Sequence, residues 1–492
     1  MGKLHLTPHL IATSGKTASC ILDQLPESCW TDPEAVFLDI CSKNGAVLQG
    51  CVSRLMKGLA DAIPNEDERH AHILQKQVFA VSPTADTAKA TRLALYGEKG
   101  AKAFGFSSED GGVFFEQCRH TYLGDSKTCF DCGLEKKLFG EGGIEAYPGL
   151  HRSVNYSRWL ARLPKGRLYI ASDPIFTVPH PARAAKGDAK GFAIGYRFFE
   201  KAEALKPACI AMALSGKWMV ERRGAGAAFR KKISECRSIA RFEIFEDAEA
   251  CFDGVRVKGG ACFFLYDREW HSPECQFVTH RADGTVLSEI RRLSLDGGLV
   301  CRSKDEMLLE NLISRACSSK KEKTLADHYS SANTYGLPTN LRDYSEEPFE
   351  GSVKVYMNRG RIGYVRLDQI KPEARCRIKR WRVAVPAAFG DKVWQNADIK
   401  PILLEPGSAA NASMITLDGW KDDAECRAVC SNLTKMAYVR HCLNIAKNTH
   451  HAAESVYGMI PACGLADPDW DDSRFKSHFS IPDDLHSRLM AG

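Results

Sequence analysis

The sequence has no long hydrophobic run and no strong excess of either charge. None of its 492 residues lies in a stretch that approaches the roughly 18 consecutive apolar residues of a membrane-spanning helix. The amino terminus has no charged segment followed by an apolar one, so we expect a cytoplasmic protein without a secretory signal or a membrane partner. A hydrophobic content of 44% and a charged content of 26% are those of an ordinary globular protein.

The cysteines show no regular spacing. Their number, 19, is odd, and without a signal peptide they are expected to be reduced thiols, most of them small buried side chains. The complete phosphate-binding motif Gly-x-x-x-x-Gly-Lys-Ser/Thr and an acidic cluster with lysine of the nuclease type are also absent from the sequence. A helicase or nuclease acting with this chain would therefore be a separate subunit.

The net charge of +6 is small and does not by itself identify a nucleic-acid partner. Basic residues do gather in places, most densely from Arg375 to Arg382. A solvated surface explains such a cluster as well as a binding site does. The length favours two or three domains, each large enough to bury its own core.

One short apolar run ends in a distinctive turn. The run Leu168–Ile170 predicts a β-strand, which stops near Asp173-Pro174-Ile175-Phe176. A carboxylate, a rigid turn and an aromatic ring would then lie at the carboxyl end of a strand, where open α/β sheets hold their ligands. The plain alternative is a surface turn, because Asp-Pro turns are common.

A second such pattern lies earlier in the chain. Residues 35–38 predict a buried parallel strand, residues 39–45 a tight turn that contains glycine, and residues 46–59 a helix. A strand, a close turn and a helix form a cradle of the kind that binds nucleotides, because the backbone comes close to the ligand.

The Asp-Pro-Ile-Phe turn resembles the Asn/Asp-Pro-Pro-Tyr/Phe motif of DNA methyltransferases that act on exocyclic amines, particularly the adenine-specific enzymes of bacterial restriction-modification systems. The resemblance implies that Asp173 and the carbonyl of Pro174 orient the amino group of an extruded adenine and that Phe176 stacks on the base. Ile175 replaces the second proline of the motif.

The turn at 39–45 is similar to the family's Asp-Pro-x-x-Gly-x-Gly loop, which binds S-adenosylmethionine. The resemblance makes Asp39, Cys41 and Gly45 candidate cofactor residues, while Lys43 replaces the first glycine. Thr7, followed by proline, resembles the segment that closes over the cofactor in the same family.

The resemblance extends in collinear order over nearly the whole chain and implies its architecture. We expect an α/β fold with a Rossmann-like S-adenosylmethionine-dependent methyltransferase sheet in residues 1–325. A β-rich DNA target-recognition domain would follow in 326–460 and a carboxyl-terminal tail in 461–492. The order of cofactor loop, catalytic loop and recognition region is that of the gamma group, and the implied partners are double-stranded DNA and a separate restriction or defence subunit.

Residues 100–155 contain a candidate zinc-binding insertion. Cys129 and Cys132 form a Cys-x-x-Cys pair followed by glycine, and His120 precedes them. With His151 or Cys118 they make a tetrahedral ligand set for a structural zinc ion. Some restriction-associated methyltransferases carry a similar insertion. The alternative is a group of reduced thiols without metal.

The main interpretation is a site-specific enzyme that transfers a methyl group from S-adenosylmethionine to the exocyclic amine of adenine in DNA. A rival is a catalytically degenerate, methyltransferase-like DNA-binding subunit of a defence or modification complex. It is motivated by the departures at Ile40, Lys43, Ser82 and Ile175. A third interpretation is an altered pocket for another base or nucleic acid.

Overall fold

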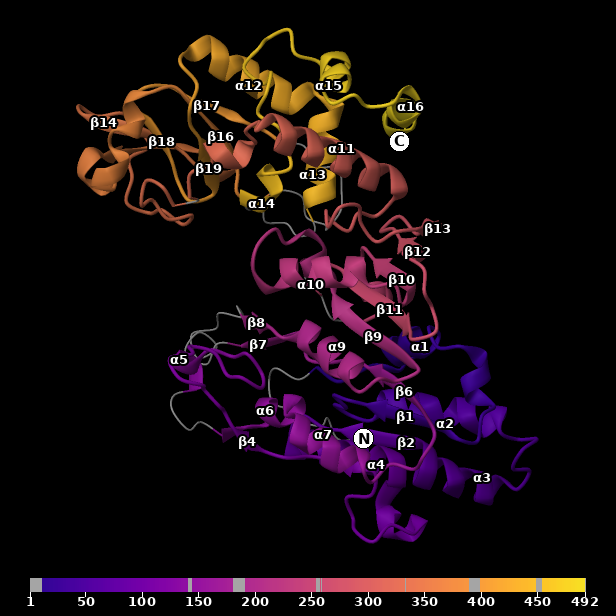
Figure 1. Cartoon of the computed structure of the whole chain (residues 1–492). Coiled ribbons are helices and arrows are strands. Elements are labelled where there is room, and N and C mark those ends of the chain that lie inside the picture. The colour runs from indigo at the N-terminus through magenta and orange to yellow at the C-terminus, as the bar shows by residue number, and fades with distance from the viewer. Residues whose placement is uncertain are drawn as a thin grey trace. The chain divides into compact units, whose positions relative to one another are not determined.

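The computed structural model describes residues 11–139, 144–179, 191–253, 257, 259–331, 333–388, 399–447 and 454–491. It divides into two compact units, of which the first comprises Met1–Gly216 and Glu235–Arg292 and the second Lys217–Ser234 and Leu293–Gly492. Neither unit is one continuous stretch of chain. Figure 1 shows their elements.

The first unit is built on one 9-stranded sheet with the order β13-β12-β10-β11-β9-β6-β1-β2-β3. The strands from β3 to β9 run parallel, and β11 runs antiparallel to both of its neighbours. A parallel set of strands within a large mixed sheet, flanked by helices, confirms the predicted α/β, Rossmann-like fold. The strands are β1 (Ala35–Asp39), β2 (Val78–Val81), β3 (Val113–Phe114), β6 (Arg167–Ser172), β9 (Cys209–Ser215), β10 (Ile239–Phe245), β11 (Ala261–Asp267), β12 (Cys275–His280) and β13 (Val286–Arg291).

The central strands are apolar because they are covered on both faces. All five residues of β1 are buried. The ring of Phe37 on β1 stacks at 5.0 Å on Trp30 and at 5.3 Å on Tyr169 of β6, which ties the two strands together. The main helices of this unit are α1 (Gly15–Leu22), α2 (Ala46–Gly58), α3 (Glu66–His72), α4 (Ala85–Tyr96), α7 (Ser153–Leu160) and α9 (Gly195–Ala204).

Most predicted elements of this unit lie where the sequence placed them, with two differences. The glycine-rich composition of residues 100–116 predicts a loop, but this stretch contains the edge strand β3, which is only two residues long. Residues 251–255 and 258–266 also resemble a late β-hairpin of the same family. Residues 251–253, the described part of the first arm, form a turn, and β11 pairs with β9 and β10.

The second unit contains two three-stranded sheets, β15-β14-β18 and β17-β16-β19, together with several helices. Its strands are β14 (Ser352–Tyr356), β15 (Ile362–Arg366), β16 (Arg382–Pro386), β17 (Ile402–Leu404), β18 (Ser408–Ala410) and β19 (Met414–Leu417). Its helices include α10 (Gly224–Glu235), α11 (Lys304–Lys320), α12 (Asp423–Lys435), α13 (Ala437–Ala446), α14 (Glu454–Tyr457), α15 (Asp472–His478) and α16 (Asp483–Ala491).

The boundary expected at residue 325 falls inside this second unit. Leu309 and Ile313 of α11 share one core with Phe475 of α15 and Leu485 of α16. The polar composition of residues 318–323 predicts a solvated connector between domains, but these residues are the exposed end of α11 and the turn after it. Residues 461–492, expected as a carboxyl-terminal tail, contribute apolar side chains to the same core.

None of the helices in the described ranges combines the length and the apolar character needed to cross a lipid bilayer.

Gly45 shows why the turn after β1 needs glycine. It caps α2 with a φ of 77°, a region that disfavours other residues. A Cβ atom there would lie 2.8 Å from the Cβ of Ala94 on α4. We expect Gly45→Ala to lower the free energy of unfolding by about 1–3 kcal/mol, measured by urea unfolding. Gly15→Ala is the matched control, because a Cβ atom at Gly15 meets nothing within 4 Å. Equal effects of the two changes would contradict the packing explanation.

Candidate active site

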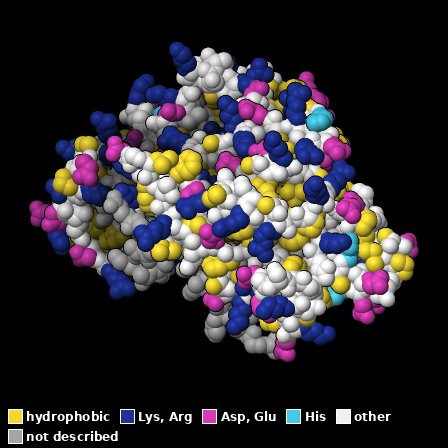
Figure 2. Space-filling model, turned by 60° about the horizontal axis from the view of Figure 1, so that its bottom comes forward, with side chains coloured by type: hydrophobic (Ala, Val, Ile, Leu, Met, Phe, Trp, Pro, Cys, Tyr) yellow, Lys and Arg dark blue, Asp and Glu magenta, His cyan; other side chains and the backbone are white. Residues whose placement is uncertain are grey.

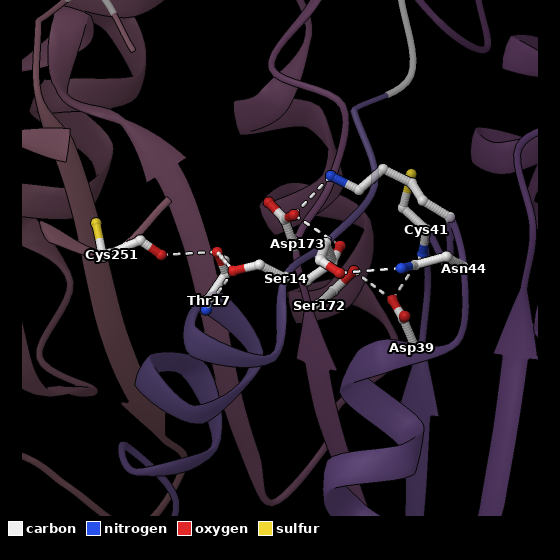
Figure 3. A network of polar contacts seen from close by, with 10 residues as sticks. Ser14, Thr17, Asp39, Cys41, Asn44, Ser172, Asp173 and Cys251 are labelled. Atoms are coloured by element: carbon white, nitrogen blue, oxygen red, sulfur yellow. Dashed lines mark hydrogen bonds and ion pairs between the residues drawn. The ribbon is translucent and has the colours of Figure 1, made fainter. Parts of the chain in front are cut away.

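The candidate site lies where the order of the sheet reverses. Strand β1 pairs with β2 on one side and with β6 on the other. The chain therefore continues from β1 to one side of the sheet and later returns to place β6 on the opposite side. Ligands of open α/β sheets bind outside the carboxyl ends of strands at such a point. Asp39 ends β1 and Asp173 follows β6, and both side chains are buried. Figure 3 shows them with Ser172 at this edge of the sheet.

Asp39 connects the two strands. Its Oδ1 accepts hydrogen bonds from Ser172 Oγ at 2.7 Å and from the backbone N–H of Cys41 at 3.1 Å. Burial raises the pKa of the Asp39 carboxyl to about 6, although these hydrogen bonds oppose the shift. Both bonds use the same oxygen and hold the turn after β1 against β6.

The raised pKa of Asp39 predicts how the stability of the protein changes with pH, and this direction can be tested. The folded protein binds this proton more tightly than the unfolded chain does, so stability falls as the pH rises from about 4 to about 6. An asparagine at this position would keep the acceptor without the charge. We expect Asp39→Asn to become more stable than the wild type as the pH rises through this window. At higher pH the difference in the free energy of unfolding should be constant at about 3 kcal/mol. Thermal melts from pH 4 to pH 8 measure the difference, and a pH-independent difference would contradict the assignment.

Asp173 has one oxygen held and one open. Its Oδ2 accepts from Lys43 Nζ at 2.6 Å and from Thr13 Oγ1 at 2.8 Å. Only 8% of the Lys43 side chain and 3% of the Asp173 side chain are exposed, so this is a buried ion pair. Its Oδ1 is buried and has no hydrogen-bond partner among the described residues. That oxygen is therefore an acceptor available to a donor such as an amino group.

The residues after Asp173 supply the turn and the aromatic ring. Pro174 and Ile175 are buried, and Phe176 is half-buried. The ring of Phe176 meets that of Phe252 edge-on at 5.9 Å. The carbonyl of Phe176 accepts from the backbone N–H of Ile194 at 3.0 Å, which fixes the end of this segment.

The predicted cofactor residues have different roles in the structure. Gly45 is explained by its packing against α4, as described above. The Cys41 thiol is buried, and burial raises its pKa. Thr7 lies outside the described residues. Asn44, which the sequence did not single out, donates from Nδ2 to the carbonyl of Thr13 at 2.9 Å.

Polar atoms without partners gather at this edge. Besides Asp173 Oδ1, the buried Oδ1 of Asn44 and Oγ of Ser82 lack hydrogen-bond partners among the described residues. They come from the turns after β6, β1 and β2, three neighbouring strands. Buried polar atoms are normally paired, so these three suit a polar ligand at the carboxyl edge. The contacts of Lys43 and Thr13 with Asp173 could not be predicted from the sequence, because these residues are 130 and 160 positions away from Asp173 in the chain.

The Cys-x-x-Cys pair lies apart from this edge as a second group. The ligand atoms of His120, Cys129 and Cys132 all lie within 4.8 Å of one another, and all three residues are buried. Cys132 Sγ is 3.4 Å from His120 Nδ1. The positive φ of Gly133, 71°, explains the glycine after the second cysteine.

His151, the fourth ligand expected from sequence, is not part of this group. Its ring packs on Phe198 at 4.6 Å. Burial, reinforced by Arg197 and Lys201, lowers its pKa to about 3. The alternative, Cys118, instead accepts a hydrogen bond from Asn155 Nδ2 at 3.5 Å. The structure thus brings three of the four predicted ligands together.

No known family model matches the sequence. It is, however, 28% identical over 288 residues to an uncharacterized adenine-specific methylase of Mycoplasma pneumoniae (strain ATCC 29342 / M129 / Subtype 1), covering 53% of this chain and 67% of that protein. The chain is thus similar in sequence to an adenine-specific methylase over about half of its length.

Solved structures are less similar to this chain in sequence. The type IIL restriction-modification enzyme MmeI in complex with DNA matches 91% of this chain and 67% of its own, with 10% identity and a TM-score of 0.49. The DrdV–DNA complex matches 83% of this chain, with 10% identity and a TM-score of 0.45. The chain spans about half, 49%, of the DrdV chain. Similarities this low carry no information on substrate.

Proposed function

We propose that this chain is a DNA methyltransferase that transfers a methyl group from S-adenosylmethionine to the exocyclic amine of adenine at a specific sequence. The observation that carries the proposal is the buried Asp173 at the sheet's switch point, with Oδ2 held by Lys43 and Thr13 and Oδ1 without a partner among the described residues. The sequence similarity to an adenine-specific methylase supports the choice of base.

In the proposed mechanism the chain acts mainly by positioning. Asp173 Oδ1 accepts a hydrogen bond from the target amine, Pro174 offers its carbonyl as a second acceptor, and Phe176 stacks on the base. Held in place through Oδ2, the carboxylate need not reorganise when the amine arrives. Burial of the site excludes water from the reacting nitrogen.

The same edge suits the cofactor. S-adenosylmethionine would supply the electrophilic methyl group when bound. Asn44 and Ser82 would hold its polar groups through the oxygens that lack partners in the described chain. Asp39 and Cys41 would shape the turn beside it, and Thr7, outside the described residues, would close over it.

The direct test uses the full chain with radiolabelled S-adenosylmethionine and a long duplex of mixed sequence. Digestion to nucleosides then identifies the labelled base. Label in N6-methyladenine supports the proposal, and label in N4-methylcytosine would correct the base. Absence of label, with cofactor binding present by calorimetry, would contradict catalysis on DNA.

The Lys43–Asp173 ion pair also favours a second candidate. A lysine in the cofactor loop that neutralises the catalytic carboxylate is what a catalytically degenerate DNA-binding subunit could carry. Calorimetric titration separates the two functions, because a degenerate subunit would bind DNA and give no heat with S-adenosylmethionine.

Further proposals concern partners and location. The first unit would carry catalysis and the second unit target recognition on double-stranded DNA, since basic and aromatic loops suit phosphate contacts and groove reading. A separate restriction or defence subunit would supply any cleavage, and the complex would act in the cytoplasm.

We further propose that His120, Cys129 and Cys132 bind a structural zinc ion, with a fourth ligand not assigned. Two thiolates and an imidazole at this separation suit zinc. We expect about one zinc ion per chain by mass spectrometry of the purified protein. Cys129→Ser should lose the metal and lower the melting temperature, while the exposed Cys376 can be changed to serine as the control. A metal-free wild type purified without chelator would contradict the site.

A further inference from the structure

A cleft in the second unit combines indole rings with positive charge. It has a volume of about 450 Å³ and is walled by two chain segments, 376–382 and 418–421. Antiparallel pairing of β16 with β19 brings the segments together, because Val383 lies opposite Leu417. A volume of this size falls in the range of about 300–1,000 Å³ typical of small-ligand sites.

The indoles of Trp381 and Trp420 both line this cleft, and each is half-buried. Trp420 stacks on His328 with ring centroids 4.9 Å apart and planes at 8°. His328 Nδ1 lies 2.6 Å from the carbonyl of Asp418, and a Cβ atom at Gly419 would come within 2.8 Å of that nitrogen. The turn that carries Trp420 is therefore fixed before any ligand arrives.

The charge of the cleft is positive. Five of the eight residues 375–382 are Arg or Lys and none is acidic. Asp418, the acidic side chain in the wall, is paired with Arg377. Lys421 lies 3.7 Å from Glu425, whereas exposed Arg380 forms no ion pair with any described carboxylate. Figure 2 shows Lys and Arg scattered among acidic side chains on one face of the molecule, so the surface charge drawn there is mixed.

Arg382, the fourth cation of the wall, has a structural role. Only 1% of the residue is exposed. Its guanidinium donates to the carbonyl of Ser408 at 2.9 Å and to the hydroxyl of Tyr335. The cations that remain for a ligand, on opposite segments of the wall, are Arg380 and Lys421, since the pair of Lys421 with Glu425 is long, at 3.7 Å, and the Lys421 side chain is exposed.

Aromatic faces beside cations suit a nucleotide, because every base can stack on an indole while its phosphate meets Arg or Lys. We propose that this cleft binds one nucleotide of a DNA strand, with its phosphate at Arg380 and Lys421 and its base against Trp381 or Trp420. The proposal rests on the proposed function for the identity of the nucleic acid. It places a DNA contact on the second unit that is independent of the methyl-transfer site.

The test measures DNA binding by the full chain without S-adenosylmethionine. Fluorescence anisotropy would follow fluorescein-labelled duplex and single strands of mixed sequence over a range of salt concentrations. Arg380→Ala should weaken binding roughly 5- to 10-fold and reduce the slope of log K against log salt by about 1. Trp381→Ala and Trp420→Ala should weaken it roughly 5- to 50-fold with the slope unchanged.

Lys435→Ala is the matched control, since Lys435 is an exposed cation at the end of α12 outside this cleft. It should change affinity less than about 2-fold. Thermal melting checks each tryptophan variant, and Arg380 is exposed enough for its replacement to leave the fold intact.

Wild-type affinity and salt slope in both Arg380→Ala and Trp381→Ala would overturn the inference. Quenching of tryptophan fluorescence by dAMP at the concentration at which the oligonucleotide acts would also overturn it, in favour of a free-nucleotide site. Cleft-dependent binding without methyl transfer would reject the proposed catalysis and leave this inference standing. A wild type that binds no DNA would reject both.

Discussion

Asp173→Ala is expected to abolish most methyl transfer. Removing the acceptor takes away the group that orients the amine, and loss of one such preorganised contact costs roughly 100- to 1,000-fold in rate. The measurement is single-turnover formation of N6-methyladenine in mixed-sequence duplex. Phe176 and Pro174 remain in place, so DNA binding should change little.

Asp173→Asn is the matched control for this result. The amide keeps an acceptor oxygen and has nearly the same shape, and the family motif accepts Asn or Asp at this place. We expect it to retain more activity than the alanine variant. Melting curves must show that both variants are folded under assay conditions, because each disturbs the pair with Lys43. Full activity in a folded Asp173→Ala protein would exclude Asp173 from the reaction.

Lys43→Met is expected to lower the free energy of unfolding by about 3–5 kcal/mol. The change leaves Asp173 as a buried carboxylate without its counter-ion, and breaking such a pair from one side is strongly destabilising. Thr13 would still donate its hydroxyl to Oδ2, but a neutral donor does not replace the ammonium. Urea unfolding at pH 7 measures the loss.

The double variant Lys43→Met with Asp173→Asn separates the ion pair from simple packing. Both charges are then absent, and most of the lost stability should return. If the loss of stability in the double variant equals the sum of the losses in the two single variants, the two side chains do not interact energetically. Higher methyl transfer in Lys43→Met would show that the ammonium restrains the catalytic carboxylate.

Local patterns of the sequence predicted much of the first unit. The apolar runs 209–215 and 239–245 predict strands with the limits that β9 and β10 have. Strands β1 and β6 end at the predicted turns, because buried parallel strands are continuous apolar runs. Strand β3 was missed since two residues between glycine-rich segments carry no periodicity. The expected domain boundary at residue 325 differs from the unit boundary at residue 293, because the exposed end of helix α11 has the same polar composition as a linker.

In the candidate site, too, the sequence predicted local features but not contacts between distant residues. Asp39 and Asp173 could be predicted, since each follows its own strand, and strands of one sheet end at a common edge. The partners of Asp173 could not, because Lys43 and Thr13 reach it only through folding. His151 was expected as a ligand by its spacing, but burial against Phe198 is a tertiary effect that spacing does not encode.

The path of the chain through the two units limits how the protein can be made and divided. Residues 217–234 leave the first unit for the second, and the chain then returns to finish the sheet up to Arg292. During synthesis the ribosome therefore completes α10, which belongs to the second unit, before it makes strands β10 to β13 of the first sheet and before it makes the rest of the second unit. No single cut separates the units intact, so after any one cut at least one of the two units lacks a segment that the other fragment holds.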